Sequence, residues 1–285
     1  MVQINLGRCV GAFLVAVAFV LGPAPASAQS IALVTDVSGK VTGAGPVTIL
    51  SEISADARLQ LEAGARLVAL YLKSGDEYTF TGPAQVQFRS AEPQVLSGMA
   101  PQKKANPLGR GSNVTIRPVN VAQAAFVMRG GRPTARIKQL SLSGTRTLES
   151  APEFRWQKLE AAARYRFELT DETGKSLYEI ELDSTSLRLP SSVQLRDGVS
   201  YTWEISARAP DNRRYVSASD FSVASAELRT QAESLRPADG TPVSERVAYA
   251  AWLEQMELRD EARRYWKTLA AERPDDTRLK ELAQE

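Results

Sequence analysis

The sequence predicts a mainly β protein that ends in a short helical segment, and two observations carry this prediction. From Ile31 to about Met99, and again from about Arg136 to Ser225, apolar and polar residues alternate in short runs separated by turns rich in glycine, aspartate and serine. After Thr241 the apolar residues recur with a period of about 3.6 instead of two, which is typical of an amphipathic helix. We therefore expect two β modules followed by a small α-helical hairpin.

The composition limits the chemistry that the protein can perform. The chain has 285 residues, with 35 Lys and Arg against 33 Asp and Glu, no His and one Cys. Without His, catalytic triads, general bases and metal sites that need imidazole are excluded. The sequence also lacks paired carboxylates, a serine with a base, a phosphate-binding glycine loop or a calcium loop at a specific spacing. It therefore predicts no catalytic residues, no cofactor and no metal, and a protein that is not an enzyme.

Residues 1–28 predict a cleaved secretory signal peptide. Arg8 precedes an apolar run from Cys9 to Leu21, and the small residues Ala26-Ser27-Ala28 follow it. The apolar run has 13 residues, whereas a membrane-spanning helix needs about 20, so the alternative of a membrane anchor is disfavoured. Cleavage after Ala28 removes the single Cys and leaves an exported chain without thiols or disulfides.

The first β module, residues 29–100, carries an ordered series of glycine turns. The segments in question are Val37-Ser38-Gly39-Lys40-Val41, Leu61-Glu62-Ala63-Gly64-Ala65-Arg66-Leu67, Ser74-Gly75-Asp76-Glu77-Tyr78 and Thr81-Gly82-Pro83-Ala84. This succession resembles the FecR-type periplasmic domain, and the resemblance implies a bacterial periplasmic protein. Domains of that family often belong to regulators that relay an outer-membrane signal to an anti-sigma segment. Only eight residues precede the apolar run here, so we expect no cytoplasmic regulatory domain, and a signal-sensing component remains the alternative function.

A basic connector is predicted at residues 101–135. Between residues 101 and 140 the sequence has eight Lys and Arg and no Asp or Glu. The segment is either a solvated linker or a contact for an anionic envelope polymer or an acidic partner. The aromatic interleaving typical of nucleic-acid binding is missing, so no nucleic acid is expected. The candidate contact residues are Lys103, Lys104, Arg129 and Arg132.

Residues 136–228 predict a β-sandwich. The expected strands are Ile137–Leu142, Glu153–Trp156, Tyr165–Thr170, Ser176–Leu182, Ser186–Leu189, Tyr201–Ala207 and Asp220–Val223. Their order, together with a Gly-x-x-Tyr-x-Trp segment before the sixth strand, resembles a fibronectin type III or Ig-like domain, in which Tyr201 matches the corner tyrosine. We expect Trp156, Tyr201 and Trp203 to be core residues, whereas their exposure would favour the alternative of a carbohydrate-binding accessory protein.

Residues 229–285 predict a polar linker as far as Thr241, then two helices and a short third one. Ala262, Trp266 and Pro274 have the spacing of the second helix of a tetratricopeptide repeat, which this segment resembles. A single unit leaves an apolar face unpaired, because about three stacked repeats are needed to bury a continuous core. The helices therefore pack on their own chain, bind a partner helix or complete a homodimer. The candidate partner-binding residues are Trp252, Tyr265 and Trp266.

These features together predict a non-enzymatic, exported binding or scaffold protein of the bacterial periplasm. We expect a protein partner in the cell envelope, with an anionic envelope polymer and a second copy of the chain as further options. Contact with the membrane is expected only through an accessory partner.

Overall fold

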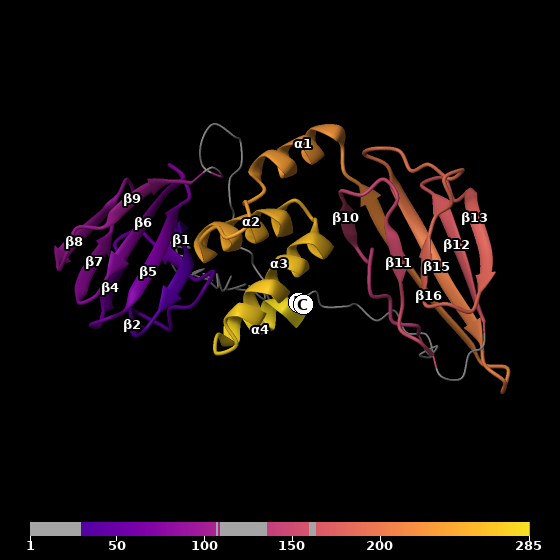
Figure 1. The fold of residues 1–285 in the computed structure, drawn as a ribbon, viewed down its shortest axis with the longest axis horizontal. Helices are drawn as coiled ribbons and strands as arrows, with labels where there is room; N and C mark the ends of the chain where they lie inside the picture. The colour runs from indigo at the N-terminus through magenta and orange to yellow at the C-terminus, as the bar shows by residue number, and fades with distance from the viewer. Residues whose placement is uncertain (1–29, 107, 109–135, 160–163, 285) are drawn as a thin grey trace, which may run out of the picture.

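The computed structural model describes residues 30–106, 108, 136–159 and 164–284. It confirms the predicted fold class, because strands dominate the described chain and the helices follow them at its C-terminal end. Figure 1 shows two β modules with the helices between them. The strands of the first module are β1 (Ser30–Ser38), β2 (Val41–Thr42), β3 (Glu52–Ser54), β4 (Arg58–Leu61), β5 (Arg66–Tyr71), β6 (Asp76–Thr81), β7 (Ala84–Phe88), β8 (Pro93–Ser97) and β9 (Gln102–Ala105).

Two sheets pack face to face in the first module, in the orders β3-β1-β5-β6-β9 and β2-β4-β7-β8. Their shared core is built around Tyr71, Phe80 and Phe88, whose rings lie 5.8 to 6.2 Å from one another where they are in contact. The middle strands β1 and β5 are buried along most of their length. Both faces of the first sheet are therefore covered, one by the second sheet and the other by the helices.

Two glycines of the first module occupy positions that a side chain could not share. Gly39 ends β1 with φ of 72°, and a Cβ atom there would lie 2.8 Å from the Cα atom of Ala65. A Cβ atom on Gly82 would lie 1.9 Å from the carbonyl oxygen of Glu62. Glycine is therefore required at both positions, because a neighbouring turn approaches the backbone too closely for a side chain.

The first module extends further along the chain than the sequence predicts. Residues 102–105 form strand β9, which pairs with β6, whereas the basic connector was expected to begin at residue 101. Lys103 lies opposite Tyr78 in this pair, and Lys104 lies opposite Glu77. The segment Gln102–Ala105 contains two adjacent lysines and shows no clear alternation of apolar and polar residues, so its sequence does not predict a strand. It forms a strand because it pairs with the edge of β6. The rest of the predicted connector, residues 109–135, lies outside the described residues.

The second module is a β-sandwich of a five-stranded and a two-stranded sheet, in the orders β10-β16-β15-β12-β13 and β11-β14. Its strands are β10 (Thr145–Thr147), β11 (Glu153–Arg155), β12 (Tyr165–Asp171), β13 (Ser176–Leu182), β14 (Ser186–Arg188), β15 (Ser200–Arg208) and β16 (Arg214–Val223). Trp156, Tyr201 and Trp203 are buried in its core, as predicted. The hydroxyl oxygen of Tyr201 accepts a hydrogen bond from the backbone N–H of Arg196 at 2.8 Å, which is the contact expected of a corner tyrosine.

The first strand of the sandwich is not where the sequence predicts it. Ile137–Leu142 contributes only an isolated bridge between Gln139 and Trp156, and the strand β10 lies three residues further on, parallel to β16. Ile137 and Leu142 are nevertheless buried in the sandwich core. The apolar character of Ile137 and Leu142 therefore predicted their burial correctly. The segment that contains them is not a regular strand, because it forms only a single β-bridge with its neighbour.

The helices are α1 (Ala226–Leu235), α2 (Val243–Gln255), α3 (Arg259–Glu272) and α4 (Thr277–Gln284). The last three match the predicted helices. Helix α1 falls where a polar linker was predicted, and it begins at Ser225, whose hydroxyl accepts a hydrogen bond from the backbone N–H of Leu228 at 3.2 Å. The polar composition of α1 hides its helical character, because Ala232 is the only fully buried residue that this helix contributes.

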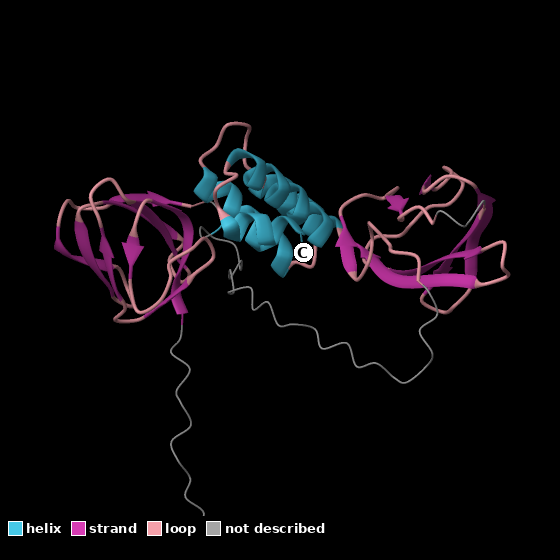
Figure 2. Ribbon diagram, turned by 90° about the horizontal axis from the view of Figure 1, so that it is seen from below, coloured by secondary structure: helices cyan, strands magenta, loops and turns pink. Residues whose placement is uncertain are grey.

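The helices form a bridge between the two β modules (Figures 1 and 2). One side of the bridge lies against β1, through α2, and the other lies against β10, through α3. No helix in the described part of the chain is long and apolar enough to cross a membrane. The predicted signal peptide, residues 1–28, is outside the described residues.

Candidate functional site

The helices and the first module share one apolar cluster. Leu33 of β1 and Leu70 of β5 are cross-strand partners that point to the side of the sheet opposite Ala32 and Tyr71. They belong to the same buried cluster as Val247, Trp252 and Trp266 of the helices. The helices are therefore docked on their own chain, and the apolar face that a lone helical hairpin would expose is covered here by the first sheet.

Three polar contacts surround this apolar interface. The Asp36 carboxylate, 4% exposed, forms ion pairs with Arg66 of β5 and with Arg273 at the end of α3, both at 2.5 Å. The Ser244 hydroxyl at the start of α2 donates a hydrogen bond to Glu77 at 3.1 Å. Burial raises the pKa of Glu77 above its ordinary value, against the lowering effect of its hydrogen bonds from Ser244 and Asn106.

On the other side, the turn between α2 and α3 lies against β10. The Thr145 hydroxyl donates to the carbonyl oxygen of Glu257 at 2.9 Å and accepts from the backbone N–H of Arg259 at 3.0 Å. The Asp260 carboxylate accepts a hydrogen bond from the backbone N–H of Leu142 at 2.8 Å. Because these contacts involve backbone groups of both segments, they fix the position of the sandwich relative to the helices in detail.

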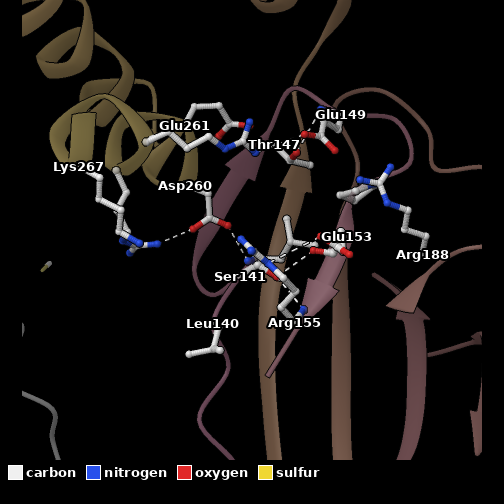
Figure 3. A pocket seen from close by; sticks show the side chains of 14 residues that line it. Leu140, Ser141, Thr147, Glu149, Glu153, Arg155, Arg188, Asp260, Glu261 and Lys267 are labelled. Carbon is white, nitrogen blue, oxygen red and sulfur yellow. Dashed lines mark hydrogen bonds and ion pairs between the residues drawn. The ribbon is translucent and has the colours of Figure 1, made fainter. Parts of the chain in front are cut away.

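A charged pocket lies next to this contact, between α3 and the two-stranded sheet of the sandwich, and we call it the junction pocket (Figure 3). Its volume is about 330 Å³. It is lined by Leu140, Ser141, Leu142, Thr147, Glu149, Pro152, Glu153, Arg155 and Arg188 from the sandwich and by Asp260, Glu261, Arg263, Arg264 and Lys267 from α3. Junctions between domains are common places for ligand sites, and this volume suits a small molecule or one unit of a polymer.

Each wall of the junction pocket carries cations and carboxylates, and most of them are paired. Arg263 pairs with Asp260 at 2.7 Å, and Arg264 pairs with Glu149 at 3.3 Å. Arg188 of β14 and Lys267 of α3 have no carboxylate partner within the described residues, although they line the pocket from opposite walls. Two unpaired cations on facing walls are suited to binding an anionic group.

Glu261 is the one deeply buried carboxyl of the junction pocket. Its side chain lies in the first turn of α3, and the residue is 8% exposed. One carboxyl oxygen accepts a long hydrogen bond from the backbone N–H of Leu148 at 3.5 Å, while Oε2 is buried without a partner. Burial raises the pKa of Glu261 to about 7. A buried polar atom without a partner is rare in a folded protein, and a bound water, ion or ligand group would complete its hydrogen bonding.

Two polar residues of the junction pocket, Ser141 and Asp260, are held by other groups of the chain. Ser141 donates its hydroxyl to the backbone oxygen of Glu153 and accepts from the backbone N–H of Arg155, both at 2.9 Å, so no side-chain base activates it. Asp260 is already engaged with Leu142 and Arg263. Among the described residues, no group of three or more Asp, Glu, Cys or His could hold a metal ion.

The predicted aromatic site residues lie in the interior of the helices. Trp252 and Trp266 are each 0% exposed, and Tyr265 is half-buried with its ring 5.1 Å from that of Tyr249. An exposed Trp266 would have favoured binding of a partner helix, whereas its burial favours docking within the chain. These three residues are brought together by α2 and α3, but as packing groups.

The predicted basic site residues are divided. Lys103 is exposed and pairs with Asp76 at 2.9 Å, with its ammonium group 5.4 Å from the ring centre of Tyr78. Lys104 pairs with Glu245 of α2. Both lysines therefore have intrachain partners, and Lys104 helps to dock the helices. Arg129 and Arg132 lie outside the described residues.

Sequence reasoning missed the junction pocket altogether. Arg188 and Lys267 are separated by about eighty residues of sequence, and each falls in an ordinary amphipathic pattern with its charge on the solvent side. Nothing in the spacing shows that β14 and α3 face each other. The one usable signal is the acidic pair Asp260-Glu261 at the start of α3, although acidic residues at a helix start ordinarily complement the backbone amides or remain solvated.

No family model matches this chain, and no curated protein matches it either. Several solved structures, including the following two, are similar to part of it. CopC from Methylosinus trichosporium OB3b is 19% identical, with 32% of this chain and 96% of that chain covered and a TM-score of 0.24. The fn3 domain of the human collagen alpha-1(XX) chain is 14% identical, with 40% of this chain and 91% of that chain covered and a TM-score of 0.25. Similarity at this level carries no functional argument, so function is argued from the geometry above.

Proposed function

We propose that this chain is a non-enzymatic, exported binding protein of the bacterial cell envelope, in which the helices hold two β modules together and the junction pocket receives the ligand. The observation that carries the proposal is the position of α3. This helix forms one wall of the pocket and is docked on the sandwich through its N-terminal end. Binding at the pocket is thereby coupled to the arrangement of the two modules.

Export and the envelope are supported by sequence alone. The predicted signal peptide at residues 1–28 and the resemblance of residues 37–84 to FecR-type domains both favour the periplasm. The carbohydrate-binding alternative expected aromatic side chains exposed on a face of the sandwich, but Trp156, Tyr201 and Trp203 are all buried. Any recognition by the sandwich must therefore use polar side chains such as those of the junction pocket.

The experiment that tests the proposal places a photo-crosslinking residue at Leu140, which lines the pocket and is 47% exposed. The matched control carries the same group at Met99, which is 70% exposed on the first module. Full-length mature chain is incubated with envelope fractions, and crosslinked material is identified by mass spectrometry. We expect an envelope component crosslinked at position 140 and not at position 99, and lost when Arg188 and Lys267 are both replaced by Gln.

Two results would overturn the proposal. Equal crosslinking at both positions, or crosslinking that survives the double replacement, would show that the junction pocket is not the binding site. Recovery of the component in a cleaved or modified form would show that the protein is an enzyme. Point variants are preferred to removal of the helices, because removal would expose the apolar face around Leu33 and Leu70 and cause association unrelated to function.

A further inference from the structure

The character of the junction pocket narrows the chemistry of its ligand. Among the described residues, its lining has no aromatic side chain, and the apolar lining residues are Leu140, Leu142 and Pro152. A neutral sugar recognised by stacking and an apolar ligand both require surfaces that the pocket lacks. Most of the remaining lining residues are charged, some as hydrogen-bond donors and others as acceptors. The ligand must therefore be polar, with groups that accept hydrogen bonds from the cations and groups that donate hydrogen bonds to the carboxylates.

The cations define one part of the ligand. Arg188 and Lys267 are exposed, face the pocket from the two walls and have no carboxylate partner among the described residues. Arg155, on the strand next to Arg188, is held only by a loose ion pair with Glu153 at 3.9 Å. An oxyanion on the ligand would pair with the cation of one wall through charge-assisted hydrogen bonds.

The carboxyl groups of the junction pocket indicate that the ligand also carries hydroxyl groups. Glu149 and Glu153 line the sandwich wall, and Glu261 lies at the helical wall with a buried oxygen that has no partner. A ligand that carried only negative charge, such as an acidic peptide side chain, would bring its charge close to these groups and gain nothing from them. A hydroxyl group donates to a carboxylate and accepts from a protonated carboxyl, so it suits Glu261 in either state.

We infer that the junction pocket binds an acidic saccharide, that is, a hydroxylated sugar ring that carries a carboxylate or a phosphate. Arg188 or Lys267 holds the oxyanion from its own wall of the pocket, and the carboxyl groups of Glu149, Glu153 and Glu261 take the ring hydroxyls. This inference rests on the proposed binding function and names the ligand class of the same pocket. Carboxylate and phosphate sugars share this chemistry and are separated by the experiment.

The experiment is isothermal titration calorimetry of the full mature chain with three probes: glucuronic acid, glucose 6-phosphate and glucose. We expect heat from at least one acidic probe and none from glucose at the same millimolar concentrations. The probe that binds identifies the oxyanion. In the variant with Arg188→Gln and Lys267→Gln, affinity should fall by about tenfold or more, because the cation that pairs with the oxyanion is lost from either wall.

The matched control variant carries Arg196→Gln and Lys280→Gln, two exposed cations outside the pocket, and should bind as the unaltered chain does. Glu261→Gln supplies a second, independent readout. Burial raises the pKa of Glu261 to about 7, so affinity for glucuronate, whose carboxylate is ionised throughout, should fall by about threefold between pH 6 and pH 8 in the unaltered chain and stay constant in the variant. Where glucose 6-phosphate is the probe that binds, its own second ionisation near pH 6 is common to both chains, and the difference between the two chains is the readout.

Three results would overturn the inference: no heat from either acidic probe, equal binding of glucose, or equal loss of affinity in the control variant. The proposed function survives any of these results if the crosslink at position 140 still captures an envelope component that depends on Arg188 and Lys267. The ligand would then belong to another class. The variants alter exposed side chains, and their circular dichroism spectra verify that the fold is retained.

Discussion

Asp36 connects three segments of the chain through a single carboxylate. It lies on β1, and it binds Arg66 on the neighbouring strand and Arg273 at the end of α3. The carboxylate is almost fully buried, whereas the two guanidinium groups are 43% and 29% exposed. Loss of the carboxylate therefore leaves two cations without their shared partner, while loss of one arginine leaves the buried charge still neutralised.

This asymmetry leads to a prediction for stability. Asp36→Ala should lower the free energy of unfolding by about 3 kcal/mol, because it removes two charge-assisted hydrogen bonds at once, each worth about 1.5 kcal/mol. Arg273→Ala should lower it by only about 1 kcal/mol, because its partner retains Arg66. Urea denaturation followed by circular dichroism measures both values. Equal effects of the two replacements would contradict the central role of the carboxylate.

Glu261 should make the protein less stable as the pH rises. Its pKa is about 7 in the folded chain against an ordinary value of 4.5, so between these values the folded state holds a proton that the unfolded state has lost. The free energy of unfolding therefore falls as the pH rises through this window, by about 3 kcal/mol in total, and is constant above it.

Glu261→Gln isolates this contribution. Glu77, whose pKa is also raised by burial, acts in the same direction and is retained in the variant. The variant should show a weaker decline of stability from pH 5 to pH 8, measured by urea denaturation at each pH. Parallel curves for the variant and the unaltered chain would show that Glu261 is ionised in the folded protein throughout this range.

At the scale of the element, α1 connects the sandwich to the other helices. Its first residues follow β16 directly, and its Ala232 carbonyl oxygen accepts a hydrogen bond from the Tyr249 hydroxyl of α2 at 2.9 Å. The end of the helix at Ser225 carries the only side-chain cap described for it. Loss of this cap should therefore destabilise α1 more than it destabilises the core formed by α2 and α3.

We predict that Ser225→Ala destabilises α1 by about 1 kcal/mol, the usual value of an N-cap side chain. Hydrogen exchange of backbone amides measured by mass spectrometry should show faster exchange in residues 226–235. Exchange in residues 243–255 should change little. Ser234→Ala, on the same helix but at its other end, is the matched control and should leave exchange at the first turn unaltered. Faster exchange spread evenly over α1 and α2 would contradict this local effect.

The elements that the sequence predicts well are those whose own residues determine them. The alternation in Tyr165–Asp171 and the helical period of Arg259–Glu272 are strong, and both elements form where they were expected. Strands β9 and β10 were missed because their partners determine them: β9 completes the free edge of β6, and β10 lies beside the distant β16. Local patterns carry no information on such pairings.

The candidate site is harder to predict than the fold for the same reason. Trp156 and Trp203 were correctly expected in the core, because large apolar groups on one face of a strand have few other places to go. Glu261 could not be recognised, since the burial that raises its pKa comes from segments that are distant in the chain, and Leu148, whose backbone N–H donates a hydrogen bond to it, lies 113 residues earlier. The pKa of a carboxyl group depends on the segments packed around it, and the sequence does not show which segments these are.

At the scale of the whole molecule, the helices are joined to the two β modules by different kinds of contact. With the first module they share one apolar cluster that includes Leu33 and Leu70. The sandwich has a core of its own, and its contact with the helices is made mainly by hydrogen bonds around Thr145 and Asp260. Apolar burial couples the unfolding of two parts strongly, whereas a polar junction of this kind couples it weakly.

We therefore predict two unfolding events in increasing urea, one of the sandwich and one of the first module together with the helices. All four Trp residues serve as reporters, because Trp156 and Trp203 lie in the sandwich and Trp252 and Trp266 in the helices. Hydrogen exchange at each urea concentration should give peptides from β1, β5 and α2 one common midpoint, distinct from that of β12 and β15. Fluorescence of a chain with Trp252→Phe and Trp266→Phe should follow the sandwich midpoint alone.

The variant Asp260→Ala tests the polar junction itself. It should move the modules apart, as measured by small-angle scattering, while leaving both unfolding midpoints nearly unchanged. A single midpoint shared by all peptides would show instead that the polar junction couples the whole molecule into one cooperative unit.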